Sequence, residues 1–342
     1  MNNDMSMEKM LPQMRVMQTV TGYAFSFVIK AAMEIDLFNK LKKESNTAKQ
    51  LSERLKVDAS ALRRLIRALA FIGLIEEEGG MYKLSDGGQA FAAGNKGKSI
   101  EPLAKYMLDD KLVSSMMALS YSIKTGKSTF EKINGVSWYE YGKENPSCLK
   151  IMDKAMENYS KINLDTVLVE YPFSNFKLIV DVAGGNGQIL SEIIKKNESC
   201  KGILFDQKAT IERVNSNLKQ YGLEKRCELV SGDMFKKVPA GGDLYLISKV
   251  LNDWEDDEVI NILKNIGASM NDKSKLIIIE TIEQDNNYSP QDIYRDLLFL
   301  TLSAGKLRNK EQFKKLILAS GLEVIDIKLT KERFSIIECR LA

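Results

Sequence analysis

Residues 178–190 read LIVDVAGGNGQIL, and this stretch decides the fold class. The apolar run that ends near Asp181 has the length and composition of a strand buried in a parallel sheet. A glycine-rich turn over residues 183–187 follows it, and a helical pattern begins near Gln188. Glycine adopts positive φ angles and lets the backbone approach a ligand closely. The stretch therefore predicts a strand, a ligand-binding turn and a helix.

The pattern of apolar residues along the chain changes near residue 175. Before that point helical periodicity dominates, and after it short apolar runs alternate with helical segments. The apolar runs are KGILFDQ (201–207), GDLYLIS (242–248), SKLIIIETI (274–282), GLEVIDIKL (321–329) and RFSIIECRLA (333–342). This alternation predicts an α/β fold, a Rossmann-like doubly wound sheet with helices on both faces.

Residues 47–92 have a different pattern. TAKQLSERLKV (47–57) predicts a short helix, and residues 58–75 predict a second one, with Asp58 or Ser60 as its N-cap and Gly73 as its end. The following residues alternate around Gly79-Gly80, as in a hairpin. Helix, turn, helix and hairpin together predict a mostly helical winged-helix domain.

Two functions fit such a domain. It could bind DNA through three arginines of the second helix, or it could be a dimerisation or lid module in which those arginines are a solvated face. They are Arg63, Arg64 and Arg67. The small net charge of +3 and the large α/β half favour the second interpretation. Residues 19–36 form an apolar helix face suited to a homodimer interface.

The composition restricts the remaining classes. The 342 residues are 44% hydrophobic and 28% charged, which is typical of a globular protein with one large domain or two. Four cysteines lie far apart without a CxxC pair, and there is no histidine, so we expect free thiols and no metal site. No apolar segment has the length of a membrane span. We expect a cytoplasmic protein without membrane or nucleic-acid partners.

Two acidic residues extend the glycine-rich turn into a ligand site. Asp206 ends the strand after Asp181, where an acid would reach a ribose hydroxyl. Asp233 and Met234 follow a third strand, where the acid could accept from an adenine amine and the thioether could pack on the ring. The turn lacks the GxGxxG spacing of a dinucleotide site. S-adenosylmethionine, which has no pyrophosphate, fits this pattern better.

The chain from about residue 12 resembles the small-molecule O-methyltransferases of bacteria and plants, of the caffeate, acetylserotonin and bacterial natural-product type. The motifs that carry the resemblance are DVAGGNG, FDQ, SGDMF, LNDWEDDE, IIIET and AGKLRNKEQFKKLILASGLEV. The resemblance implies a winged-helix dimerisation domain over residues 1–100, linker helices over 101–165 and a methyltransferase domain over 166–342. It also implies a homodimer with S-adenosylmethionine as cofactor.

The resemblance also assigns residues to the site. It implies that Asp181 and Gly185 line the methionine end of the cofactor, that Asp206 binds the ribose, and that Asp233 and Met234 hold the adenine. Further cofactor-binding positions are Gly184, Gln207, Phe235, Ser248 and Lys249. The linker helices would form much of the substrate pocket, with Met117, Met152 and Met156 suited to a flat apolar substrate. A methionine stripe with helical spacing is also typical of a plain core.

The catalytic part departs from the family pattern. The family's LHDW histidine, which deprotonates the substrate hydroxyl, is Asn252 here. One of the two acids that flank that histidine is present as Glu280, and the other is replaced by Leu307. Asparagine cannot accept a proton at neutral pH, although it can hold a hydroxyl or carbonyl by hydrogen bonds. The chain therefore resembles a methyltransferase without its base.

Three functions remain open for such a chain. The first is methyl transfer to a small aromatic or polyketide-like metabolite, on an acidified oxygen, a nitrogen or a carbon, with Asn252 and Glu280 as catalytic residues. Glu280 could act as base if burial raises its pKa, and Lys249 could do so if its pKa is lowered, although we expect that lysine to face solvent. The second is a non-methylating reaction, such as hydroxylation, decarboxylation or a pericyclic rearrangement, that keeps the cofactor for its charge. The third is a DNA-binding regulator that senses a ligand.

The acidic cluster at residues 253–258 has two interpretations. Its oxygen ligands would suit Mg²⁺. Acids at the start of EVINILKNI would also cap that helix and complement its dipole, which is the interpretation we favour.

Overall fold

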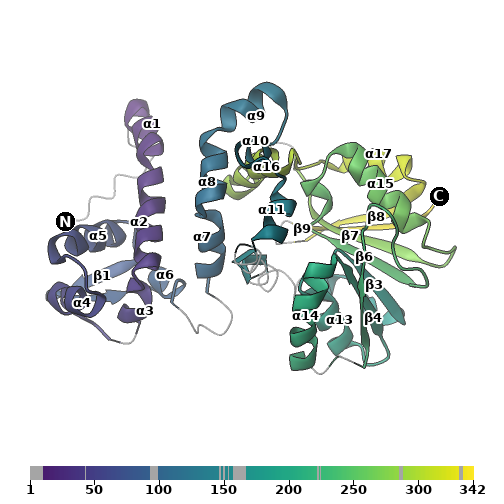
Figure 1. Ribbon diagram of the computed structural model, residues 1–342, viewed down its shortest axis with the longest axis horizontal. Helices are drawn as coiled ribbons and strands as arrows, with labels where there is room; N and C mark the ends of the chain where they lie inside the picture. Colours follow the sequence, from purple (N-terminus) through teal and green to yellow (C-terminus); the bar gives the residue numbers. More distant parts are fainter. Residues whose placement is uncertain are drawn as a thin grey trace. The chain divides into compact units, whose positions relative to one another are not determined.

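The structure is a computed structural model that describes most of the chain. The described residues are 11–42, 44–92, 99–145, 148, 151–152, 154–156, 167–221, 223, 225–284, 288–330 and 334–342. The chain divides into two compact units, Met1–Asp109 and Asp110–Ala342 (Figure 1). The finer division into 1–100, 101–165 and 166–342 stays a prediction.

The first unit consists of helices and one hairpin. Its helices are α1 (Pro12–Thr21), α2 (Tyr23–Glu34), α3 (Leu37–Leu41), α4 (Ala48–Leu55), α5 (Ala59–Phe71), α6 (Asp86–Gln89) and α7 (Glu101–Met107). The hairpin pairs β1 (Ile75–Glu78) with β2 (Met81–Leu84) around Gly79 and Gly80, which both have positive φ. The side chain of Asp58 caps α5. The predicted helix, turn, helix and hairpin are therefore confirmed.

The surface of this unit carries the two features that the sequence singled out. The predicted helical stretch 19–36 is divided at Gly22 between α1 and α2. Its apolar side chains Val20, Tyr23 and Phe27 are exposed in the single chain. The three arginines of α5 are also exposed, as a solvated helix face requires.

The second unit is built on a seven-stranded sheet. Its strands are β3 (Leu178–Val182), β4 (Lys201–Asp206), β5 (Cys227–Ser231), β6 (Leu244–Ser248), β7 (Lys275–Thr281), β8 (Leu322–Leu329) and β9 (Phe334–Leu341). The order across the sheet is β5-β4-β3-β6-β7-β9-β8. The first five strands of this order are parallel, and β9 is antiparallel to both β7 and β8. The predicted doubly wound sheet is confirmed, with an antiparallel edge.

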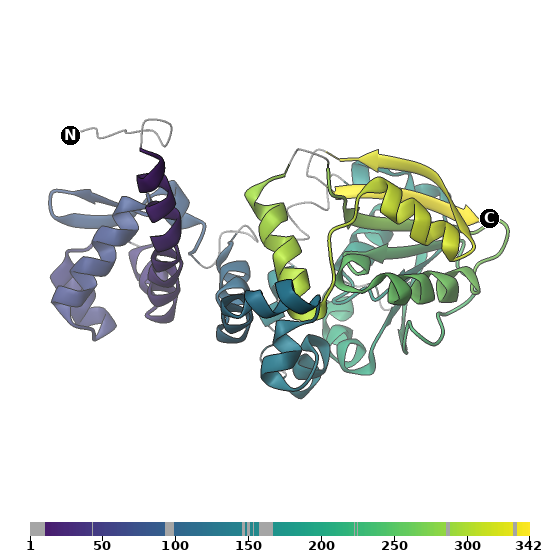
Figure 2. The same cartoon turned by 90° about the horizontal axis from the view of Figure 1, so that it is seen from above.

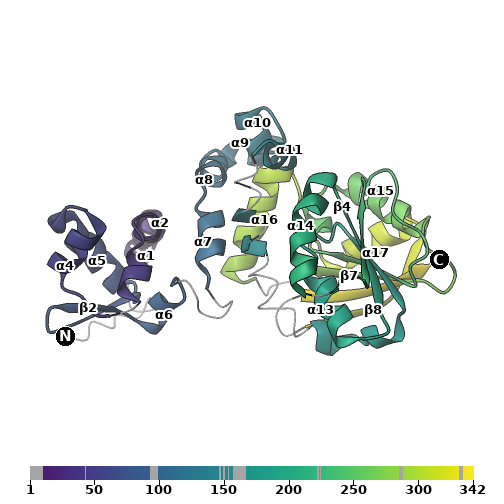
Figure 3. The ribbon, with the colours of Figure 1, turned by 60° about the horizontal axis from the view of Figure 1, so that its bottom comes forward.

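Helices cover both faces of the sheet (Figure 3). One face packs against α13 (Gln188–Lys196) and α14 (Lys208–Tyr221), and the other against α15 (Asp256–Gly267) and α17 (Lys310–Ala319). Each face has its own apolar cluster, in which most strand side chains are below 5% exposed. Strands buried on both faces are the reason for their continuous apolar runs.

A second group of helices lies beside this sheet within the same unit (Figure 2). It comprises α8 (Asp110–Met117), α9 (Leu119–Thr125), α10 (Thr129–Asn134), α11 (Trp138–Glu144) and α16 (Pro290–Ser303). The buried Ser128 hydroxyl, which caps α10, donates to the carbonyl oxygens of Thr301 and Leu302 at 3.1 and 2.8 Å. These two bonds join the start of α10 to the C-terminal end of α16, from which the chain continues into residues 304–309. Across the described residues, no helix has the length and apolar character needed to cross a membrane.

Candidate active site

The predicted site residues meet at one edge of the sheet. Asp206 ends β4, Asp233 follows β5, Ser248 ends β6 and Glu280 is the penultimate residue of β7. The glycine-rich turn follows β3. In parallel α/β sheets, ligands bind outside the carboxyl ends of the strands, where the strand order reverses. Here that point lies between β3 and β6.

The turn after β3 is shaped by its backbone. Ala183, Gly185 and Gly187 have φ angles of 54°, 58° and 73°. The Gly185 amide donates to Asp206 Oδ2 at 2.9 Å, so the turn is held to the end of β4. A Cβ atom on Gly184 would lie 2.6 Å from the Asp181 carboxyl and 2.3 Å from the Leu204 side chain. Only glycine fits there without a shift of its neighbours.

Asp181 is a buried acid below this turn. Asp181 is 2% exposed, and its Oδ2 atom has no hydrogen-bond partner among the described residues. Burial, together with the nearby Asp206, raises the pKa of Asp181 to about 8, and Lys249 opposes the shift. A buried acceptor without a partner costs free energy unless a ligand satisfies it.

The residues after β4 and β5 form short local turns. The Gln207 amide donates to Asp206 Oδ1 at 2.6 Å, and the Phe235 amide donates to Asp233 Oδ1 at 3.0 Å. Met234 packs against the apolar cluster of the α15 face. These bonds hold both acids at the ends of their strands.

Glu280 and Asn252 form a buried pair at the end of β7. Glu280 Oε1 accepts from the amides of Val250 and Leu251 at 2.7 and 2.8 Å. Its Oε2 accepts from Asn252 Nδ2 at 2.9 Å, and the same nitrogen donates to the Thr281 carbonyl at 2.9 Å. Because both partners are pure acceptors, they fix the orientation of the amide. Asn252 Oδ1 is therefore the atom that points away from them, and no described residue hydrogen-bonds to it.

Burial and hydrogen bonds act on the pKa of Glu280 in opposite directions. Burial raises its pKa, while hydrogen bonds from four backbone amides lower it. Its two oxygens already accept from the backbone and from Asn252. We infer that this acid orients Asn252 and the segment before it.

A second acid lies beside Asn252. Asp253 Oδ2 accepts from the Tyr139 hydroxyl of α11 at 2.6 Å. The Tyr139 ring stacks on Trp254 with a centroid distance of 4.9 Å, and Trp254 meets the ring of Phe235 edge to face at 4.8 Å. Burial raises the pKa of Asp253 to about 7, opposed by the Tyr139 hydrogen bond and assisted by Glu280. Neither Tyr139 nor Asp253 was predicted as a site residue.

The expectation that Lys249 faces solvent is wrong. Lys249 is half-buried, and burial lowers its pKa to about 8, with Glu280 opposing the shift and Arg295 adding to it. Its ammonium lies 6.0 Å from the centroid of the Phe334 ring. The backbone at Lys249 is left-handed, with φ of 57°, which is uncommon outside glycine and concentrates at functional sites.

The loop that follows α16 braces the segment Leu251–Trp254. The fully buried Arg308 donates to the Leu251 and Trp254 carbonyls at 2.8 and 2.6 Å and to Asp256 Oδ1 at 2.8 Å. Gly305 lies against the same segment. Leu307, which the resemblance places where an acid was expected, is buried. These contacts fix the backbone of the segment Leu251–Trp254.

The remaining acids of the cluster 253–258 cap α15. Glu255 and Glu258 form a reciprocal capping box, and Asp256 pairs with Arg308 and Lys306. The favoured interpretation as helix caps is confirmed for Glu255 and Glu258, Asp256 and Asp257 lie in the first turn of α15, and Asp253 departs from this interpretation. In the described part of the chain, no group of three or more potential ligands is placed to hold a metal ion.

The three methionines predicted for the substrate pocket have different surroundings. Met117 is 83% exposed, whereas Met152 and Met156 are half-buried. Met116 lies at the α8 contact with α16, where Thr301 Oγ1 is 3.6 Å from its sulfur. Their predicted role in binding substrate stays a prediction.

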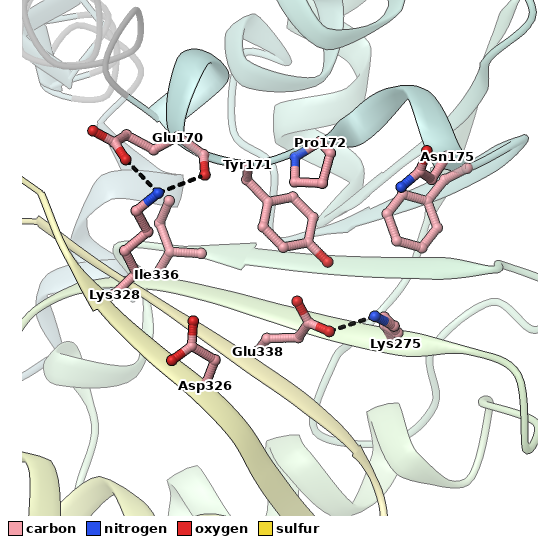
Figure 4. Close-up of a pocket in the computed structure, with 10 residues that line it drawn as sticks. Glu170, Tyr171, Pro172, Asn175, Lys275, Asp326, Lys328, Ile336 and Glu338 are labelled. Carbon is pink, nitrogen blue, oxygen red and sulfur yellow. Dashed lines mark hydrogen bonds and ion pairs between the residues drawn. The ribbon is translucent and has the colours of Figure 1, made fainter.

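A separate cavity of about 220 Å³ lies over β8 and β9 (Figure 4). Two ion pairs line it, Lys328 with Glu170 and Lys275 with Glu338. The Tyr171 ring points toward Glu338 (Figure 4). None of the candidate active-site residues lines this cavity, so the cavity is distinct from that site.

The site fits S-adenosylmethionine. Buried oxygens of Asp181 and Ser248 lack partners within the described ranges, and the turn at Gly184 lets the backbone approach closely. An adenosyl group has hydroxyl and amine donors for acids such as Asp206 and Asp233. A Rossmann-like sheet with these features defines the class of S-adenosylmethionine-dependent methyltransferases.

Comparisons with known proteins identify the family. Residues 116–323 match the O-methyltransferase domain, and residues 17–94 match the O-methyltransferase dimerisation domain. The chain belongs to this O-methyltransferase family. It is an enzyme that uses S-adenosylmethionine to methylate small metabolites.

Several relatives are similar over almost their whole length. Phenazine O-methyltransferase of Lysobacter antibioticus is 29% identical over 95% of both chains. Myricetin 3-O-methyltransferase 3 of Solanum habrochaites is 30% identical over 94% of this chain and 93% of its own. The solved structure of mitomycin 7-O-methyltransferase superposes with a TM-score of 0.91 at 27% identity, over 96% of this chain and 98% of that one.

Proposed function

We propose that the protein methylates an acidified hydroxyl group of a small aromatic or polyketide-like metabolite without a histidine base. The proposal rests on Asn252 Oδ1, which is buried and has no hydrogen-bond partner among the described residues. This residue follows β6, beside the carboxyl ends of the parallel strands. The family favours oxygen as the methyl acceptor over nitrogen or carbon. Phenazine and flavonol methyltransferases among the relatives support an aromatic substrate.

In this proposal Asn252 positions the methyl acceptor. Its amide nitrogen is held by Glu280 and Thr281, so Oδ1 can only accept a hydrogen bond. A substrate hydroxyl that donates to Oδ1 would satisfy an atom whose burial costs about 1–3 kcal/mol. Glu280 would hold the amide in this orientation.

The cofactor would be held at the ends of β3, β4 and β5. Asp206 would bind the ribose hydroxyls, Asp233 and Met234 the adenine, and Asp181 the methionine end. Further contacts would come from Gly184, Gly185, Gln207, Phe235, Ser248 and Lys249. The bound cofactor supplies an electrophilic methyl group on a positively charged sulfur.

Loss of the imidazole does not remove the main sources of catalysis. General base catalysis contributes about 10²–10⁴-fold, while the alignment of two reactants reaches effective molarities of about 10⁵–10⁸ M. An acidified hydroxyl is already partly ionised near neutral pH. We therefore expect such acceptors to be methylated and ordinary phenols to react slowly.

The assembly and the substrate pocket complete the proposal. The dimerisation domain supports a homodimer. Met152 and Met156, with Met117, would contribute to an apolar wall for a flat substrate. The expected cytoplasmic location stays a prediction.

The test uses S-adenosylmethionine with a CD₃ methyl group. The purified protein is incubated with catechol, myricetin, 4-hydroxybenzaldehyde and 2-hydroxy-1,4-naphthoquinone, and with a metabolite extract from source cells that lack the gene. Mass spectrometry should find a labelled methyl ether, and Asn252→Ala should raise KM for its precursor. An unlabelled product that forms only with cofactor would support the non-methylating alternative and refute methyl transfer.

A further inference from the structure

We propose that Asp253, held by Tyr139, accepts the proton of the methyl acceptor and so replaces the missing imidazole. The inference rests on the proposed function, because it names the base for that same methyl transfer. It concerns a carboxyl group next to Asn252, together with a tyrosine that comes from a helix 114 positions away in the sequence.

The geometry holds the carboxyl in one orientation. Tyr139 donates to Oδ2 at 2.6 Å, and its ring is fixed by stacking on Trp254. A carboxylate has two oxygens, so one can hold the tyrosine while the other receives a proton. The backbone on either side is fixed as well, since Arg308 binds the carbonyls of Leu251 and Trp254. Such fixed geometry is what a general base requires.

The charged groups around Asp253 explain its readiness to take a proton. Glu280 of β7 is an acid that disfavours a second negative charge, and Tyr139 of α11 stabilises that charge. Lys306 and Arg308 of the 304–309 loop pair with Asp256. The result is a pKa of about 7 for Asp253, caused first by burial. A base is most effective when its pKa lies near the working pH.

The same value defines the class of substrate. Proton transfer to a carboxylate of pKa about 7 is nearly balanced for a hydroxyl of similar acidity. An unactivated phenol, with a pKa of about 10, is a poor match. The acceptor should therefore be a hydroxyarene whose oxygen is acidified by a conjugated carbonyl group.

The step balances with this residue as base. The acceptor oxygen forms a bond to the methyl carbon while the bond between that carbon and sulfur breaks. Sulfur keeps the electron pair and leaves as neutral S-adenosylhomocysteine. The hydroxyl proton passes to Asp253, which is neutral after the step and returns the proton to solvent.

Lys249 is the competing base, with a lowered pKa of about 8. Its charge interacts with Asp181 and Glu280, and its ammonium lies over Phe334. As a cation, Lys249 would compensate negative charge on these two acids. It would lose this role if it gave up its proton. Asp253 is adjacent to the residue that would hold the acceptor, and we therefore favour it.

The test measures kcat/KM against pH with the acceptor labelled in the CD₃ experiment. For the wild type, kcat/KM should rise through about pH 7 and then level, because protonated Asp253 cannot act as base. Asp253→Asn should lower kcat by about 10²-fold or more, and any limb that remains should follow the ionisation of the free acceptor, which is measured by its absorbance. Tyr139→Phe should shift the limb to higher pH, because the hydrogen bond that lowers the pKa of Asp253 is lost.

Three controls separate the outcomes. Asp257→Asn changes an exposed acid of the same cluster and should match the wild type. Asp253→Glu should recover part of kcat, and cofactor binding by calorimetry should be unchanged in Asp253→Asn. If Asp253→Asn keeps the wild-type rate and limb, or if Lys249→Met alone removes the limb, the proposal is overturned while methyl transfer stands. If no acceptor is labelled at all, both proposals fail.

Discussion

Replacing Arg308 with alanine is expected to lower the free energy of unfolding by about 3–5 kcal/mol. The guanidinium is fully buried and donates to two backbone carbonyls and to Asp256. Without it, the carbonyl oxygens of Leu251 and Trp254 lose these hydrogen bonds inside the protein. Urea denaturation of the wild type and Arg308→Ala measures the change, and activity should fall with it because the bonds brace Asn252 and Asp253.

Lys306→Ala is the matched control for this substitution. Lys306 pairs with the same Asp256 at 2.9 Å, but both side chains are almost half exposed, at 45% and 47%. An exposed ion pair contributes about 0–1 kcal/mol. Lys306→Ala should therefore lower the free energy of unfolding by no more than about 1 kcal/mol. If Arg308→Ala also lowers it by less than about 1 kcal/mol, the buried guanidinium does not brace the site.

Replacing Gly305 with alanine is expected to lower kcat by about 10²-fold. The added Cβ would lie 2.3 Å from the Asn252 carbonyl oxygen and 2.8 Å from the Asp253 carbonyl carbon. Because these are backbone atoms of a braced segment, the segment itself must shift, and displacements of about 1 Å can cost this much. Methyl-transfer kinetics with the labelled cofactor measure kcat, and calorimetry should show unchanged cofactor affinity.

Gly267→Ala is the control for this second prediction. Gly267 ends α15, and a Cβ there would have its nearest neighbour at 3.5 Å, an ordinary contact. We expect wild-type kinetics for that variant. If Gly305→Ala also retains wild-type kcat, the position of the Asn252–Asp253 backbone does not control the reaction.

Much of the sheet could be predicted from the sequence, because strands buried on both faces are continuous apolar runs. The position of Asp206 at the end of β4 follows directly from one of those runs, whereas Asp233 after β5 was found from its motif. The direction of β9 could not be predicted, since an apolar run has the same pattern in either direction. The break at Gly22 was also missed, because the apolar pattern continues on both sides of it.

The candidate site was predicted where it depends on motifs and missed where it depends on tertiary contacts. Asn252 and Glu280 stand at motif positions, and the structure brings them together. The bond from Tyr139 to Asp253 joins two distant segments, and no local pattern marks the tyrosine. Lys249 was expected in solvent because lysine usually is, but its position after β6 leaves it half-buried.

The most direct test of the roles of Asn252 and Asp253 is a crystal structure of the protein with S-adenosylhomocysteine and the hydroxyarene that was labelled in the CD₃ experiment. We predict that the acceptor hydroxyl donates to an Asp253 carboxyl oxygen at about 2.6–3.2 Å, and that another donor of the bound ligands reaches Asn252 Oδ1. An acceptor oxygen bound to Lys249 instead, with Asn252 Oδ1 still without a partner, would contradict the account.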